Sequence, residues 1–486
     1  MIVVVDVGTS SLRVSLLDSQ GLIVHCSQSK YSLSYPEPDA VEMDMKVFTG
    51  ALWAALKDSA LCAEANALKV EAFAVTAQRS SVIPVDEGGK ALDNALMWQD
   101  TRSFPICDAL KQKKKEIYSI TGMSLSTVFS SPKMQWLKEN KREIYDRSYK
   151  LIGFCEYTVH QLCGAFATDT SIASRTSLFD VAALKWSDSL IDIFGIAKEK
   201  LCPVIPVGSV AGFASKRLCE LFKLDSDVPV ISSGGDQQCA ALGQGCTRPG
   251  DIMINTGSGA YVLGLVDRPV YSFENGISCN VSALNGKWNV EGSVLSAGKT
   301  LDWVNELFFA SEAEKNKYEN FTRACLASPP GANGMRFSVH FAGRGTPVWD
   351  ASERGAVFGL SFKNTKNDIA RAVMEGIAAA IGECLEYTEK TMESCTKSVR
   401  ISGGLAKDAL FIRMLSAVSK KKLLYSNESE STTLGAWINA SLALGKYKTA
   451  EDAFGVLNER LETSAFQSSI EECELYGKIA SELRLK

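Results

Sequence analysis

The chain has only three histidines, and none of its fourteen cysteines form a Cys-x-x-Cys pair. Zinc sites in proteins are usually built from such clusters, so a site of His and Cys ligands is not expected. His25, His160 and His340 lie far apart, and the cysteines are scattered from Cys26 to Cys473. In a large chain without an export signal, we expect them to be reduced and mostly buried thiols.

Long apolar runs and a basic tract are also missing. No run approaches the roughly 18–20 residues that span a membrane. The apolar opening, residues 2–5, stops at Asp6 and predicts a buried strand, not a signal peptide. Lys and Arg number 52 against 56 Asp and Glu, and the dense basic cluster at 111–115 is interpreted as a solvated helix face. We therefore expect a cytoplasmic protein with neither nucleic acid nor a membrane as partner.

What is present is ample material for packed cores. The 486 residues, 46% of them hydrophobic, predict two or three domains. Predicted strands alternate with amphipathic helical stretches, which indicates an α/β architecture of mixed sheets with helices on their faces. The predicted helices include residues 47–61, 132–141 and 369–392, and the predicted strands include 71–76, 229–233 and 398–402.

A strand–turn–strand pattern occurs twice. The copies are residues 2–6, 8–11 and 12–17, and residues 252–255, 257–259 and 260–267. Two unrelated hairpins could produce the same pattern, because Gly/Ser turns between apolar strands are common. Since each copy opens about half of the chain, we favour a duplicated domain, with an N-terminal domain over 1–247 and a C-terminal domain over 248–486. No low-complexity linker separates the halves, so the ligand is expected between them.

Four glycine-rich turns follow predicted strands, at residues 8–11, 234–235, 257–259 and 403–404. Glycine lets backbone N–H groups converge on an anion without a Cβ in the way. Further donors for phosphate oxygens are available from Thr9, Ser10, Ser11, Ser258 and the charged Arg13. A single tight turn needs no ligand. The pairing of the Gly8 and Gly257 turns across the two halves, however, predicts a clamp on the phosphates of a nucleotide.

The tripeptide at 298–300, Gly-Lys-Thr, offers a competing phosphate site because it looks like the end of a P-loop. That motif requires a glycine five residues before its Gly-Lys pair, where this chain has Ser293. The simpler interpretation is a helix over 299–308 whose buried face includes Leu301, Val304 and Leu307/Phe308.

Two aspartates follow predicted strands. Asp236 comes after the turn at 234–235 and begins a helical run. It is either an ordinary helix cap or a general base that accepts the proton of an attacking hydroxyl, with the helix N-terminus favouring its ionised form. Asp6 is either a turn residue or a holder of Mg²⁺, through water, beside the first phosphate turn.

A third polar cluster combines Gln78 and Arg79, which follow a predicted strand, with Trp98, which ends an apolar run. Polar side chains beside an aromatic plate suit a polyhydroxylated ligand, whose C–H faces pack on rings while its hydroxyls need hydrogen bonds. The alternative is a buried Arg–Asp pair and a core tryptophan.

Taken in order, the motifs resemble the FGGY family of carbohydrate kinases over nearly the whole chain. The segments that carry the resemblance are 6–13, 94–102, 234–244, 359–376 and 403–408. The resemblance implies two ribonuclease-H-like domains of the actin/hexokinase type around a central cleft. It also implies ATP and Mg²⁺ in that cleft, and transfer of the γ-phosphate to a hydroxyl of a small sugar or polyol.

The resemblance also implies a role for each matching residue. Asp236 falls on the catalytic base, and Asp6 on the Mg²⁺ position, reached through water. The substrate pocket is implied at Gln78, Arg79, Trp98, Asp236, Gln237 and Tyr261. Contacts to ATP are implied at Gly8, Thr9, Ser10, Ser11, Arg13, Gly257, Ser258, Gly298, Gly404 and Asp408.

Two departures leave the substrate open. Glycerol kinases follow the pocket arginine with a glutamate, which here is Ser80, and their pocket tyrosine corresponds to Val128. Xylulokinases carry a Met-His pair where this chain has Arg79-Ser80. We therefore expect a kinase of a small sugar or polyol, with a glycerol kinase or xylulokinase proper as the alternative. A more distant alternative is an ATPase or binding protein of the superfamily without a sugar acceptor, and the oligomeric state, a homodimer included, is open.

Overall fold

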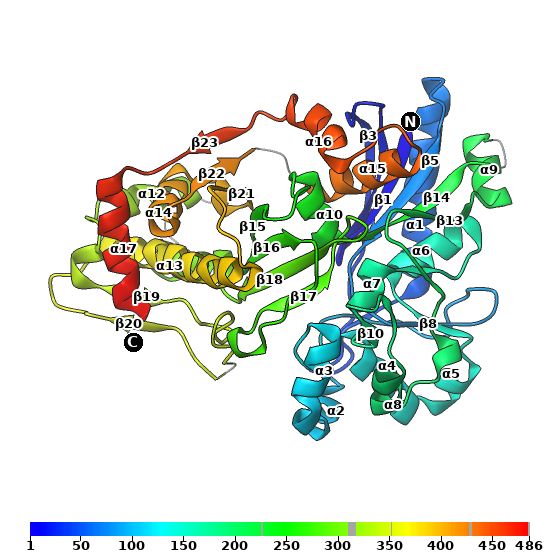
Figure 1. Ribbon diagram of the computed structural model, residues 1–486, viewed down its shortest axis with the longest axis horizontal. Helices are drawn as coiled ribbons and strands as arrows, with labels where there is room; N and C mark the ends of the chain where they lie inside the picture. The colour runs from blue at the N-terminus through cyan, green and yellow to red at the C-terminus, as the bar shows by residue number, and fades with distance from the viewer. Residues whose placement is uncertain (225–226, 310–316, 351, 427–429, 485–486) are drawn as a thin grey trace.

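The computed structural model describes all residues except 225–226, 310–316, 351, 427–429 and 485–486. Two mixed β-sheets form its framework, the first in blue at the right of Figure 1 and the second, mostly green, near the middle. The first sheet has the strand order β13 (Ser209–Phe213), β14 (Pro229–Gly235), β5 (Ala72–Ala77), β1 (Ile2–Val7), β2 (Ser11–Leu17) and β3 (Ile23–Lys30). The second has the order β17 (Ser278–Val281), β18 (Trp288–Val294), β16 (Ala260–Val266), β15 (Ile252–Thr256), β21 (Ser398–Gly403), β22 (Lys422–Tyr425) and β23 (Ser464–Phe466).

The two sheets contain the same five-stranded core. In the first, β1 pairs antiparallel with β2 and parallel with β5, and β5 pairs parallel with β14. In the second, β15 pairs antiparallel with β16 and parallel with β21, and β21 pairs parallel with β22. The third strands, β3 and β18, extend each hairpin in the antiparallel sense. The repeat predicted from the two strand–turn–strand patterns is confirmed by this shared connectivity.

Strand β1 is apolar throughout because both faces of the first sheet are covered. Val3, Val5 and Val7 belong to one buried cluster, and Ile2 and Val4 belong to another on the opposite face. The first face is covered by α1 (Met45–Ala65), α6 (Phe154–Cys163) and α9 (Lys216–Phe222). The opposite face is covered by α10 (Asp236–Gly243), α15 (Ser431–Ala443) and α16 (Ala450–Asn458).

Helices α15 and α16 come from the end of the chain yet lie against the first sheet, as Figure 1 shows in orange beside blue strands. Trp437 of α15 is fully buried there, and its Nε1 donates to the carbonyl of Asp18 at 3.0 Å. Gly243 and Gly435 let α10 and α15 approach with their backbones in contact, since a Cβ on either residue would lie 1.9 Å from a carbonyl oxygen of the other helix. This contact anchors the helix that begins at Asp236.

The remaining helices divide between the two halves. The second sheet packs with α11 (Gly298–Phe309), α12 (Lys317–Leu326), α13 (Lys366–Met392), α14 (Ala409–Ser419) and α17 (Ile470–Arg484). The lower right of Figure 1 holds a helical extension of the first half, made of α2 (Phe104–Ala109), α3 (Lys114–Thr121), α4 (Ser130–Asn140), α5 (Arg142–Arg147), α7 (Thr170–Ser174) and α8 (Asp188–Phe194). The short paired strands are β4 (Glu42–Met43) with β7 (Ala95–Leu96), β6 (Ile83–Val85) with β8 (Lys150–Ile152), β9 (Thr168–Asp169) with β12 (Val204–Ile205), β10 (Phe179–Asp180) with β11 (Lys185–Trp186), and β19 (Arg336–Ser338) with β20 (Ala356–Phe358).

All six helices and strands named from the sequence are present, as α1, α4, α13, β5, β14 and β21. A helix is also present at 298–309, but part of its predicted buried face is wrong. Leu301 and Val304 are buried as predicted, but Leu307 and Phe308 are exposed. The buried face continues instead through Asn305 to Phe309, which lies about one turn after Asn305.

All fourteen cysteines are free thiols, and seven of them are buried. Within the part of the chain that the structure describes, no helix combines the length and the apolar character that crossing a bilayer requires.

The contact between α10 and α15 predicts a strong effect of one methyl group. Gly435→Ala would place a Cβ 1.9 Å from the carbonyl oxygen of Cys239, so the helices must separate. We expect a loss of about 1–3 kcal/mol in the free energy of unfolding, measured by urea denaturation. Gly455→Ala in α16 is the matched control, because nothing lies within 4 Å of its added Cβ. It should be neutral or stabilise by about 0.5–1 kcal/mol. Equal stability of the two variants would contradict the close packing of α10 on α15.

Candidate active site

Three parallel strands of the first sheet end at one edge and bring the predicted polar residues together. Asp6 lies near the end of β1, Gln78 and Arg79 follow β5, and Asp236 follows β14. The side chain of Gln78 links two of these strand ends, since its Nε2 donates to the carbonyl of Gly8 at 3.2 Å. Ligands of α/β proteins commonly bind at such carboxyl edges.

Arg79 is the centre of a charged cluster. Its Nε lies 3.3 Å from Asp236 Oδ1, and its Nη1 donates to Gln238 Oε1 at 3.1 Å. The same Nη1 lies 3.9 Å from Oε2 of Glu291, which belongs to β18 of the second sheet. Arg79 therefore connects the predicted base in one half with a buried carboxylate in the other.

The pKa values of the two aspartates are perturbed. Burial raises the pKa of Asp236 above its ordinary value, while Arg79 and the N–H of Gln237 act in the opposite direction. The favourable effect expected from the helix N-terminus is thus outweighed by desolvation. Burial raises the pKa of Asp6 to about 7, with a further rise from the nearby Asp236. Perturbed carboxyl groups of this kind are typical of functional sites.

The first predicted phosphate turn is tight. The Gly8 N–H donates to the carbonyl of Ser11 at 2.9 Å, and the carbonyl of Ser10 accepts from Tyr31 N at 3.0 Å. The hydroxyl of Thr9 accepts from Trp98 Nε1 at 3.1 Å. The indole ring of Trp98, a predicted substrate-pocket residue, therefore lies beside this turn. Arg13 lies opposite Asp6 in the sheet and forms an ion pair with Glu430 at 3.5 Å.

The second predicted phosphate turn is bound to the start of α11. Gly298 N donates to the carbonyl of Gly257 at 3.0 Å, and the carbonyl of Ser258 accepts from Ala297 N and Lys299 N. A Cβ on Gly298 would lie 2.5 Å from the Gly257 oxygen, so glycine is required for this approach. Lys299 therefore lies at the start of α11, beside the second predicted phosphate turn. The P-loop motif around it lacks the glycine that the motif requires.

Gly404 and Asp408 differ in their surroundings. Gly404 N donates to the carbonyl of Thr256 at 3.0 Å, and the space where a Cβ would lie is open. Asp408 caps α14 by accepting from Phe411 N at 3.0 Å, and its other oxygen accepts from the hydroxyl of Thr322. Both carboxylate oxygens of Asp408 therefore accept hydrogen bonds from other protein groups.

The remaining predicted pocket residues surround the junction of the two halves. Trp98 and Tyr261 keep 36% and 37% of their surface exposed. Gln237 Oε1 accepts from Nδ2 of Asn255 at 3.2 Å, another link between the halves. Trp98 is therefore not a core residue. The predicted alternative of a buried Arg–Asp pair is present beside it, because Arg102 Nη2 donates to Asp100 Oδ2 at 2.7 Å.

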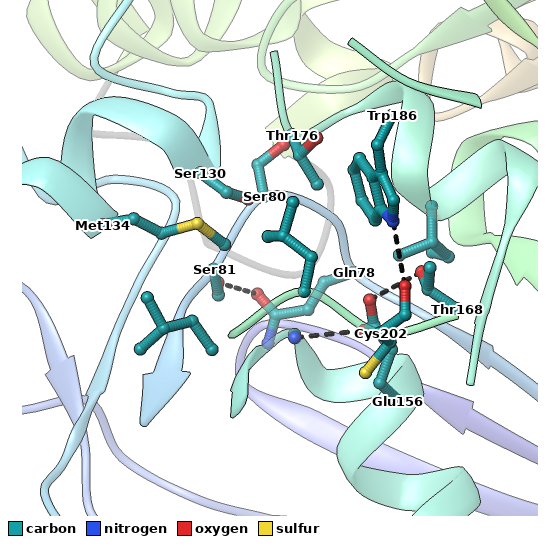
Figure 2. Close-up of a pocket in the computed structure, with 14 residues that line it drawn as sticks. Gln78, Ser80, Ser81, Ser130, Met134, Glu156, Thr168, Thr176, Trp186 and Cys202 are labelled. Atoms are coloured by element: carbon teal, nitrogen blue, oxygen red, sulfur yellow. Dashed lines mark hydrogen bonds between the residues drawn. The ribbon is translucent and has the colours of Figure 1, made fainter. Parts of the chain in front are cut away.

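A small internal cavity lies behind this site, inside the first half. Figure 2 shows that Gln78, Ser80 and Thr176 line it together with polar groups of other elements, and that Ser81 donates to Gln78 Oε1 at 3.5 Å. Its volume of about 20 Å³ suits an ordered water rather than a sugar. The cavity is therefore too small to hold a sugar.

Asp6 fits a role near a cation. Its carboxylate has no hydrogen bond or ion pair among the described residues, although only 8% of Asp6 is exposed. Mg²⁺ in kinases is commonly held by one or two carboxylates together with the phosphates of the nucleotide. No cluster of three or more acidic, His or Cys ligands occurs in the described part of the chain, so the protein would supply only part of the ligand set.

Two charged residues of this site were missed from the sequence. Glu291 is 7% exposed in the middle of β18, and Arg175 is 7% exposed just after α7. An isolated charge within an apolar strand was the available signal for Glu291, since an unpaired buried carboxylate is unfavourable. Arg175 carried no comparable signal, because its segment is polar on both sides.

The sequence matches known proteins along most of its length. Residues 1–243 match the N-terminal domain, and residues 252–444 the C-terminal domain, of the FGGY family of carbohydrate kinases. A glycerol kinase of Thermococcus gammatolerans is 30% identical over 459 residues, which cover 92% of this chain and 90% of that protein. Glycerol kinase 2 of Thermotoga maritima is 29% identical over 492 residues, which cover 97% and 96%.

Solved structures agree on the fold. Gluconate kinase from Lactobacillus acidophilus superposes with a TM-score of 0.91 at 24% identity, covering 100% of this chain and 97% of that one. Plasmodium falciparum glycerol kinase with ADP superposes with a TM-score of 0.89 at 24% identity, covering 100% and 98%. The predicted α/β architecture of two actin/hexokinase-type domains is confirmed.

The family matches, the relatives and the repeated sheet agree with the motifs quoted from the sequence. The predicted activity, ATP-dependent phosphorylation of a sugar or polyol, is confirmed at the level of the family. The chain belongs to the FGGY family of carbohydrate kinases.

Proposed function

We propose that this kinase transfers the γ-phosphate of ATP to a hydroxyl of a small, neutral or charged sugar or polyol, with Asp236 as the general base. The position of Asp236 supports the proposal most. It begins α10 at the strand edge that also carries the glycine turn, and Arg79 holds its carboxylate at 3.3 Å. About a quarter of the Asp236 side chain, 26%, stays exposed, so an acceptor hydroxyl can reach it.

The proton transfer follows from this arrangement. Asp236 takes the proton of the acceptor hydroxyl as its oxygen forms a bond to the γ-phosphorus. The bond from that phosphorus to the β–γ bridging oxygen breaks, and ADP leaves with the bridging oxygen. Arg79 restrains the carboxylate and offsets its charge before the proton arrives, which keeps it ionised more often than burial alone would allow.

The nucleotide is proposed to lie along the glycine turns of both halves. Donors to its phosphates would come from the first turn, Gly8, Thr9, Ser10, Ser11 and Arg13, and from the second, Gly257 and Ser258. Gly298 and Gly404 allow close approach of the nucleotide, and Asp408 is proposed beside it through backbone contacts. Asp6 would hold Mg²⁺ through water, and the cation would supply positive charge that offsets the charge of the phosphates.

The acceptor is proposed to bind among Gln78, Arg79, Trp98, Gln237 and Tyr261, with its C–H face on Trp98. The relatives named glycerol kinase favour a polyol, but Ser80 and Val128 replace two polar anchors of that branch. The Ser80 hydroxyl also donates a hydrogen bond to the carbonyl of Arg175 at 3.1 Å. A ketose or polyol larger than glycerol therefore suits the pocket better. The free thiols of all fourteen cysteines support a reducing, cytoplasmic location.

An ATP-consumption screen tests the function. Glycerol, erythritol, xylulose, ribulose and hexuloses are compared with an acceptor-free control, and at least one should raise ADP release strongly. ATP hydrolysis that no acceptor increases would instead identify an ATPase of the same superfamily.

The role of Asp236 predicts a large loss of turnover on a small change. Asp236→Asn keeps the size of the side chain but removes the proton acceptor, so kcat should fall by about 10²–10⁴-fold while ATP still binds. Asp44→Asn is the matched control, because Asp44 caps α1 by accepting from Lys46 N at 2.7 Å and is not one of the proposed site residues. Asparagine caps nearly as well as aspartate, so the control should keep its turnover. More than a tenth of the normal turnover in Asp236→Asn would assign Asp236 to capping alone.

The raised pKa of Asp236 predicts the acid limb of the pH profile. The base works only when ionised, so kcat/KM should fall as the pH drops through a pKa above the ordinary aspartate value of 3.8. Arg79→Gln removes a cause that lowers this pKa, so the limb should move to higher pH. Arg79→Lys keeps the charge and should leave the limb close to its original place. A limb that does not move in Arg79→Gln would contradict the coupling.

The departures at Ser80 and Val128 predict that glycerol is a poor substrate. Its kcat/KM should lie below that of the best four- to six-carbon acceptor in the screen. Val128→Tyr restores one hydroxyl, which should improve glycerol about tenfold over Val128→Phe, since one hydrogen bond contributes about 1–1.5 kcal/mol. Glycerol ranking first with the unmodified enzyme would refute this prediction.

A further inference from the structure

We propose that Arg175 and Glu291 form a second hydroxyl-binding pair of the acceptor site, which selects neutral polyhydroxylated substrates over sugar acids. The inference rests on the proposed function and narrows its substrate class. Neither residue belongs to the predicted pocket, and they come from opposite halves of the chain, one after α7 and the other from β18.

Arg175 is a buried cation without a polar partner. Only 7% of the residue is exposed, and its Nε is enclosed without an acceptor. Among the described residues, no carboxylate or carbonyl pairs with its guanidinium, whose one assigned contact is the ring of Phe129 at 5.0 Å. The other arginine buried to this degree among the described residues, Arg371, has an ion pair with Glu375 at 2.8 Å. A buried guanidinium left unpaired is unfavourable unless a ligand completes it.

Glu291 is the complementary group. Its Oε2 is buried and accepts no hydrogen bond, and its nearest cation is Arg79 Nη1 at 3.9 Å. Glu291, Asp236 and Tyr261 all interact electrostatically with Arg175, while burial and Arg79 lower the pKa of its guanidinium to about 10. Arg175 therefore belongs to the same charged cluster as the proposed base.

Hydrogen bonds to its backbone segment hold Arg175 close to the proposed acceptor site. The Ser80 hydroxyl donates to the carbonyl of Arg175 at 3.1 Å, and Ser80 directly follows Arg79. Ser131 N donates to the carbonyl of the next residue, Thr176, at 2.9 Å, which ties this segment to the start of α4. The guanidinium thereby lies over the ring of Phe129, at 5.0 Å from its centre.

The chemistry of the pair favours one class of ligand. A hydroxyl can accept a hydrogen bond from Arg175 and donate one to Glu291 at the same time. A carboxylate can accept from Arg175 but has no proton for Glu291, and the two negative charges repel each other. Arg79 and Asp236 are proposed to bind the hydroxyl that is phosphorylated. Arg175 and Glu291 would therefore bind a hydroxyl farther along the substrate.

Replacing Arg175 separates a ligand-binding role from a structural one. Arg175→Met keeps the length and apolar volume of the side chain but removes the unpaired charge, so the apo protein should melt at an equal or higher temperature. The stabilisation by erythritol, xylulose and ribulose, measured as the shift in melting temperature, should be lost. KM for these acceptors should rise roughly ten- to hundredfold, with KM for ATP unchanged within about twofold. Arg175→Lys keeps the charge and should lie between the two.

Arg371→Met is the matched control, since it removes a buried arginine that has a carboxylate partner in α13. It should lower the melting temperature and leave the acceptor-induced shift intact. If Arg175→Met behaves like this control, Arg175 is structural and the proposal is overturned. A third outcome is distinct from these two. If ADP stabilises the unmodified enzyme but none of the acceptors does, both this proposal and the proposed function fail.

Selectivity tests Glu291 itself. The unmodified enzyme should be stabilised by the neutral acceptors and not by gluconate at the same concentration. Glu291→Gln removes the repelling charge but keeps an acceptor oxygen, so discrimination against gluconate should fall at least about tenfold. Equal stabilisation of the unmodified enzyme by gluconate and by the neutral acceptors would overturn the proposed selectivity.

Discussion

The guanidinium of Arg79 connects the two halves of this kinase at the place where the chemistry is proposed. It contacts Asp236 and Gln238 of the first half and lies within ion-pair distance of Glu291 on the second sheet. Such a shared cation allows carboxylates to lie close together without prohibitive repulsion. It also makes the ionisation of Asp236 depend on the second half, because any separation of the sheets would change the charges around Arg79. With the acceptor bound as proposed, this one side chain would couple substrate binding to the position of the two halves.

The framework that holds Arg79 is the edge where β1, β5 and β14 end. Parallel strands have their carboxyl ends on one side of a sheet, and each brings a residue with a proposed chemical role to this edge. The next layer is α10, whose first residue is Asp236 and whose last, Gly243, touches α15. Since α15 arrives from the end of the chain, the base is positioned by segments almost two hundred residues apart. Stability at this helix contact and catalytic geometry are therefore linked.

Two charged groups at the site lack partners within the described part of the protein. Asp6 is a buried carboxylate without a hydrogen bond, and Arg175 is a buried guanidinium without an acceptor. Both arrangements reduce the stability of the unliganded protein, and both are complementary to what a sugar kinase binds, a cation with phosphates on one side and a hydroxyl on the other. The contrast with Arg102 and Asp100, a buried pair that satisfies itself, separates groups that serve the fold from groups left open for a ligand.

Local patterns in the sequence determined the strands, the glycine turns and the polar residues that follow them, because these depend on a few neighbouring residues and on backbone sterics. Asp6, Gln78, Arg79 and Asp236 could be predicted to meet, since the ends of parallel strands share an edge. Only the tertiary structure decided that Glu291 and Arg175 join them and that α15 covers the first sheet. Such contacts join residues far apart in the chain, as where Asn439 Nδ2 donates to the carbonyl of Ser233, 206 positions away. No local propensity specifies such pairs, because they form only when whole sheets and helices pack.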